Sequence, residues 1–104
     1  MAPFLRRAAT TEWGQHLYVL TIDDRLVKVG RSWNPTQRLH QIQLGCPILD
    51  ISLAAVYCGR GGIEAAVHQV CRRRFTRVGA SSEWFVASTP EIFGVIAEVV
   101  DGLA

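Results

Sequence analysis

The stretch LVKVGRSWNPTQRL, residues 26–39, gathers three cations around one glycine. Lys28 and Arg31 flank Gly30, and Arg38 lies one turn into the helix that is predicted to follow. Glycine lets a large group approach the backbone closely. Arginine presents a planar fork of donors that matches phosphate oxygens. This grouping therefore predicts a binding site for an anion, and phosphate is the best candidate.

Tyr18 precedes this stretch within HLYVLTI, residues 16–22, which is rich in β-branched and aromatic side chains. If these residues pair with residues 25–30 as a hairpin, Tyr18 and Lys28 can point to the same face. A neighbouring lysine stabilises a phenolate and lowers the tyrosine pKa from its usual value of about 10. Tyr18 is therefore a candidate general base.

Glu64 is the only acidic residue between Asp50 and Glu83, and it opens a predicted helix after a glycine-rich loop. Magnesium keeps several waters and takes further oxygens from substrate phosphate, so one carboxylate can suffice to hold it. A base, phosphate-binding cations and a metal carboxylate together favour phosphodiester hydrolysis. The arginine triplet that begins at Arg72 also permits a phosphate-bearing partner.

Each of these residues also has an ordinary structural interpretation. Tyr18 can be a packed aromatic, and Lys28 can lie on the solvent face of an edge strand. Arg38 can cover its helix, and Glu64 can favour the positive end of the next one. His68 can be a half-buried helix residue. The functional interpretation depends on their joint arrangement.

Length and composition predict one domain that must position these residues. The chain has 104 residues, of which 49% are apolar and 19% charged, with a net charge of +2. We expect residues 1–14 to form a flexible N-terminal arm and residues 15–104 a single domain. Three widely spaced cysteines without a C-x-x-C pair argue against a disulfide framework and fit a reducing cytoplasm. No apolar run is long enough to span a membrane.

Periodicity and end signals predict a mixed order of strands and helices, which favours a small α/β or α+β domain around about three strands. Asn34 and Pro35 are expected to start the first helix, and Thr89 and Pro90 the last. The expected elements are a hairpin of residues 16–22 and 25–30, a helix ending near Leu44, a strand at 49–58, a helix at 63–75, a short loop-to-strand segment at 80–88 and a helix reaching Val100.

Several short motifs along residues 17–85 resemble the GIY-YIG nuclease superfamily, and most closely its compact branch found in phage and bacterial proteins. HLYVL and VKVGRS resemble the first two motifs, with Lys28 where many members carry tyrosine. The branch then shows P-x-x-R-L, E-x-x-x-H and E-W-F. These appear here, in the same order, as PTQRL (35–39), EAAVH (64–68) and EWF (83–85).

The resemblance implies a three-stranded antiparallel sheet flanked by helices, and one Mg²⁺ or Mn²⁺ ion. It implies that Tyr18 activates the attacking water with help from Lys28. Arg31 and Arg38 would hold the scissile phosphate beside Gly30. Glu64 would carry the metal ion. His68 would support that site or contact phosphate. Glu83 and Trp84 would lock the sheet edge, and an approach of Glu83 to the site is the alternative.

We therefore expect a cytoplasmic, metal-dependent endonuclease that cuts DNA with little sequence preference, alone, as a homodimer or with a partner protein. Two other functions stay open. The second-motif tyrosine is replaced and no asparagine follows Asn34, so the chain can instead be a non-catalytic module that binds nucleic acid or a nuclease. It can also be a protein-interaction domain in which Trp13, Trp33 and the last helix expose an apolar face.

Overall fold

The predicted hairpin consists of β1 (His16–Ile22) and β2 (Leu26–Ser32) in a computed structural model that describes residues 14–79 and 83–103. Asp23 and Asp24 between the strands both have φ 55°, and Arg25 N donates to Ile22 O at 3.0 Å. Two central residues with positive φ make a type I′ turn, whose twist matches that of the strands. The register pairs Tyr18 with Gly30 and Leu20 with Lys28, so alternation assigned the faces correctly.

The sheet has five strands, and the expected three-stranded sheet is wrong. The strand order is β3-β1-β2-β5-β4, and every pairing is antiparallel. The sheet also includes the expected β3 (Ile51–Tyr57) and two short strands. β5 (Trp84–Val86) lies within the expected loop-to-strand segment at 80–88, whereas β4 (Thr76–Arg77) was not expected. Segments of two and three residues are too short to show an alternating pattern. They become strands because β5 pairs with β2 and β4 pairs with β5. The fold is still α+β.

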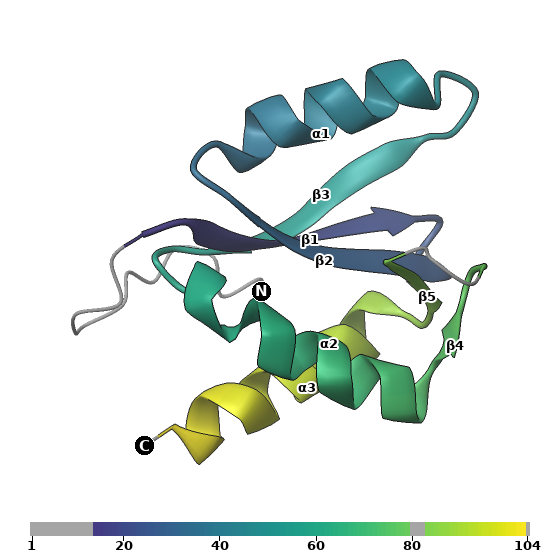
Figure 1. The fold of residues 1–104 in the computed structure, drawn as a ribbon. Helices are drawn as coiled ribbons and strands as arrows, with labels where there is room; N and C mark the ends of the chain where they lie inside the picture. Colours follow the sequence, from purple (N-terminus) through teal and green to yellow (C-terminus); the bar gives the residue numbers. More distant parts are fainter. Residues whose placement is uncertain (1–13, 80–82, 104) are drawn as a thin grey trace.

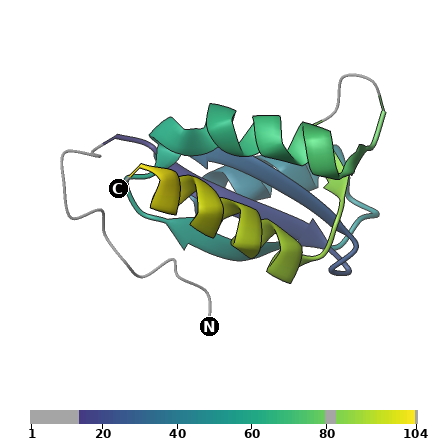
Figure 2. The same ribbon diagram turned by 90° about the horizontal axis from the view of Figure 1, so that it is seen from below.

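Helices cover both faces of this sheet (Figure 1). α1 (Pro35–Gly45) lies on one face, while α2 (Glu64–Arg74) and α3 (Thr89–Gly102) lie side by side on the other (Figure 2). The Asn34 side chain caps α1 as predicted, by accepting from Gln37 N at 3.1 Å. The cap of α3 is Ser88, one residue before the expected Thr89.

A short 3₁₀ turn, η2 (Gly61–Ile63), leads directly into α2. Gly61 N donates to Gln15 O at 2.7 Å, which ties the turn to the residue that precedes β1. The start of α2 is therefore placed by the start of the first strand.

The sheet separates two hydrophobic cores of unequal size. The larger core lies between the sheet and the α2–α3 pair and includes Val29, Val67, Phe85 and Ile92. The smaller core lies toward α1; its buried members are Tyr18, Leu20 and Ile51, with Leu39, Ile42 and Trp84 packed against them. Side chains from α1 and from α2 can therefore meet only around an edge or end of the sheet.

The predicted N-terminal arm falls almost wholly outside the described residues, and so does Trp13. Among the described helices, none is both long enough and apolar enough to cross a membrane.

Candidate functional site

A cavity of about 500 Å³ opens beside the second half of β2. Pairing with β5 covers only Leu26 to Lys28, so within the described chain no strand lies beyond Val29–Ser32. Residues from both faces of the sheet meet at this open edge. The walls include Tyr18 from β1, Lys28, Gly30 and Arg31 from β2, Arg38 from α1 and Glu64 from α2.

Gly30 makes room for the Tyr18 side chain. A Cβ atom at position 30 would lie 2.4 Å from Tyr18 Oη and 2.5 Å from Tyr18 Cζ, well inside van der Waals contact. The phenol therefore packs directly over the glycine backbone, and its position depends on the missing side chain.

Burial raises the pKa of Tyr18, and the negative charges of Glu64 and Glu83 act in the same direction. Arg38 opposes them by stabilising the phenolate. The expectation that a neighbouring lysine lowers this pKa is therefore wrong, because desolvation of a residue only 3% exposed outweighs the opposing charge of Arg38. Tyr18 is a neutral phenol at neutral pH.

Both carboxylates of the cavity are paired with cations from β2. Arg31 Nε lies 3.4 Å from Glu64 Oε1, and Lys28 Nζ donates to Glu83 Oε1 at 2.6 Å. The hydrogen bond from Lys28 is the main reason why the pKa of Glu83 is lowered. The charges of the cavity are thus largely compensated within it.

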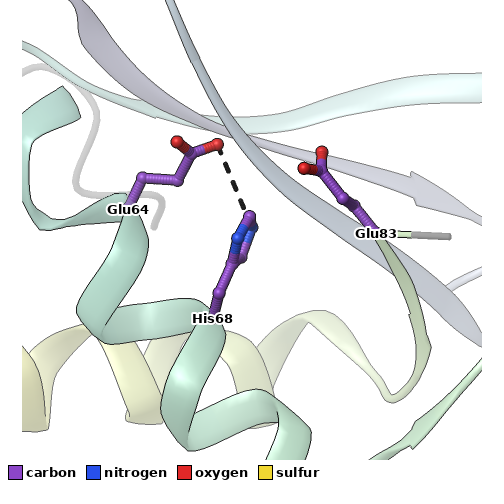
Figure 3. Close-up of side chains that lie close together, drawn as sticks. All are labelled: Glu64, His68 and Glu83. Carbon is purple, nitrogen blue, oxygen red and sulfur yellow. Dashed lines mark ion pairs between the residues drawn. The ribbon is translucent and has the colours of Figure 1, made fainter. Parts of the chain in front are cut away.

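His68 ties α2 to the open edge of β2. Its Nε2 lies 2.6 Å from Val29 O, a distance at which the ring N–H donates to the carbonyl, and 4.0 Å from Glu64 Oε2 (Figure 3). The side chain is only 8% exposed. Arg72, one turn further along α2, is exposed and does not line the cavity, although its charge helps to lower the pKa of Glu83.

Glu64, His68 and Glu83 form a group that could hold a metal ion (Figure 3). Each offers one ligand atom, and these atoms lie within 4.8 Å of one another. Two carboxylates suit a hard divalent cation such as Mg²⁺ or Mn²⁺. Since His68 Nε2 donates to Val29 O, it has no free lone pair for a metal ion; the carboxylates are left as the ligands, and His68 supports them.

The structure thus brings together Tyr18, Lys28, Gly30, Arg31, Arg38 and Glu64, with His68 directly behind Glu64. The sequence favoured the sheet edge as the place of Glu83 and left an approach to the site as the alternative; the structure places Glu83 in the cavity wall. The EWF motif marked the position, but the contact with Lys28 spans 55 residues, and no local pattern predicts it.

A family model described as the T5orf172 domain matches residues 15–101. No curated protein and no solved structure matches the chain.

Proposed function

The chain belongs to the T5orf172 domain family, a phage-associated domain of the GIY-YIG nuclease-like type, and from this premise we propose that it is a divalent-metal-dependent endonuclease that hydrolyses phosphodiester bonds in DNA. We also propose that the protein acts in the cytoplasm and binds the phosphate groups of DNA.

One observation carries the proposal. A single cavity collects a tyrosine, three cations and a carboxylate from β1, β2, α1 and α2, across 46 residues of sequence from Tyr18 to Glu64. Each residue taken alone has an ordinary structural explanation. These separate explanations, however, do not account for why a buried phenol, two arginines and a helix-starting glutamate lie around one glycine.

The cations would bind and orient the scissile phosphate. Arg38 enters the cavity from α1 and Arg31 from β2, so their guanidinium groups approach a phosphate from two elements. Arginine donates two parallel hydrogen bonds to such an anion. Arg31 is held by Glu64 at 3.4 Å, a loose pairing that a phosphate can replace.

Glu64 would hold the divalent ion. Such an ion stabilises negative charge that develops on phosphate and leaving oxygens. His68 would fix the distance between α2 and β2 through its bond to Val29 O.

Tyr18 would accept a proton from the attacking water. Only the phenolate can do so, and Arg38 is the cation whose charge favours that form. A raised tyrosine pKa means that the active fraction increases as the pH rises, so cleavage is expected to become faster with pH across the neutral range.

The test is nicking of supercoiled plasmid with Mg²⁺ or Mn²⁺, comparing wild type with Glu64→Gln. The substitution keeps the side-chain shape but removes the charge. We expect it to lower the cleavage rate by about 10²-fold or more, because a bound cation contributes several kcal/mol of transition-state stabilisation.

Glu98→Gln on α3 is the matched control, since it removes a carboxylate from an outer-surface ion pair with Arg74. It should cleave as wild type does. Salt-sensitive DNA binding without cleavage by wild type would contradict the enzyme and indicate a non-catalytic binding module.

A further inference from the structure

Lys28 is the only lysine of the chain, in which 11 residues are lysine or arginine. Every other cationic side chain of that set is an arginine. A lysine ammonium is compact and sits on a flexible four-carbon stem, so it must be held from outside if it is to point in one direction. Lys28 lines the cavity, and its side chain is only 15% exposed.

The residue that holds it comes from the other side of the sheet edge. Lys28 pairs with Leu20 and Trp84, which pack in the smaller core toward α1. Glu83 comes directly before β5, and its carboxylate belongs to the group formed with Glu64 and His68 of α2 (Figure 3). The Lys28–Glu83 hydrogen bond of 2.6 Å therefore joins the two faces of the sheet at the edge of β2, at the point where the pairing of β2 with β5 ends.

We infer that Glu83 is a positioning residue of this site: its carboxylate holds the Lys28 ammonium at the open edge of β2, between Tyr18 on one face and Glu64 on the other. This inference rests on the proposed nuclease function for its catalytic consequence, but the positioning itself can be measured without cleavage. Without the carboxylate, the lysine stem would turn toward water.

The Lys28–Glu83 and Arg74–Glu98 ion pairs have the same length but differ in how exposed the cationic side chain is. Arg74 Nη2 and Glu98 Oε1 also lie 2.6 Å apart, but both side chains are about half exposed, 49% and 57%. Exposed pairs hold flexible side chains weakly and contribute little. In the Lys28–Glu83 pair the glutamate side chain is also about half exposed, at 53%, but the lysine side chain is only 15% exposed, and contacts along its stem limit the directions in which it can point. The position of the Lys28 ammonium therefore depends on Glu83.

The kinetic test is a double-mutant cycle with Glu83→Gln, Lys28→Met and the double variant, measured as kcat and KM for plasmid cleavage. Glu83→Gln should lower kcat by about 10²-fold, as expected for a misplaced group, with little change in KM. Adding Glu83→Gln to Lys28→Met should lower kcat no further, because the glutamate acts through the lysine. Glu83→Asp, which restores the carboxylate, should recover part of the rate, and Glu98→Gln should match wild type.

A single lysine also allows a direct structural readout. Protein labelled with ¹³C at the lysine Cε gives one lysine methylene signal by NMR. In wild type the two Hε protons should differ in shift, because the ammonium is held. In Glu83→Gln they should merge toward the value of a free lysine, while in Glu98→Gln they should stay separate.

The outcomes separate the two proposals. Cleavage by Glu83→Gln at the wild-type rate, or additive effects in the double variant, would overturn the positioning role while the nuclease stands. A wild type that fails to cleave would overturn the proposed function. The lysine signal then still decides the inference: an averaged Hε pair in wild type contradicts it, and a held pair that is lost only in Glu83→Gln supports it.

Discussion

At the scale of single residues, the packing of Tyr18 over Gly30 leaves no room for a side chain at position 30. A Cβ at position 30 would come within 2.4 Å of the phenol oxygen, so Gly30→Ala must displace the ring. We expect the variant to fold with a loss of about 1–3 kcal/mol, as for other overpacked sites. We also expect cleavage to fall by about 10²-fold, because the tyrosine is misplaced.

Gly94→Ala is the matched control for this prediction. Nothing lies within 4 Å of a Cβ at position 94, which is exposed in α3. Alanine in a helix is about 0.5–1 kcal/mol more favourable than glycine, so this variant should be more stable and cleave as wild type does. Equal cleavage by both alanine variants would contradict the role of Gly30.

The chemical types of the site residues could be predicted from the sequence, but their electrostatic state could not. Alternation correctly placed Tyr18 and Lys28 on one face. It could not show that burial raises the Tyr18 pKa, or that Lys28 faces Glu83. The burial of Tyr18 and the Lys28–Glu83 contact both depend on residues that are far apart in the sequence. No regular spacing in the sequence predicts such tertiary contacts.

At the scale of elements, the two capped helices make different contributions. Asn34→Ala removes the oxygen that accepts from Gln37 N, and Ser88→Ala removes the corresponding hydroxyl of α3. Each should reduce the free energy of unfolding by about 0.5–2 kcal/mol. Only Asn34→Ala should also slow cleavage, because α1 carries Arg38 into the cavity. Urea unfolding and plasmid nicking of both variants test this, and equal cleavage would show that the first turn of α1 does not set Arg38.

Long elements with clear end signals could be predicted closely. Asn34 and Pro35 marked the start of α1. The start of α3 was one residue off, because Ser88 and Thr89 are both good caps and only Ser88 exchanges bonds with Glu91. β4 was missed because two residues carry no period. Its strand character comes entirely from pairing with β5.

At the scale of the whole molecule, the end of β3 links stability to pH. Tyr57 packs against the larger core, and burial raises its pKa to about 12 from 10.0. In the unfolded chain the phenol loses its proton first, so the unfolded state binds fewer protons between these two values. The stabilising contribution is therefore complete below pH 10 and declines as the pH rises toward 12.

Tyr57→Phe removes this titration. Between about pH 8 and about pH 11, the free energy of unfolding should fall more for wild type than for Tyr57→Phe. Urea unfolding at both pH values measures the difference. Tyr18 is present in both proteins, so its own raised pKa affects them alike. An equal fall in both proteins would show that folding does not raise the pKa of Tyr57.

The tie between η2 and the residue before β1 also has a consequence for the sequences that this fold accepts. A Cβ at Gly61 would lie 2.5 Å from Gln15 O and 2.9 Å from Gln15 C, both backbone atoms that cannot move aside as a side-chain tip can. In a saturation library selected for folding, position 61 should accept glycine alone. Gly45 and Gly102, with open space around them, should accept many residues. As related sequences diverge, positions with open space around them could change, but position 61 would stay glycine.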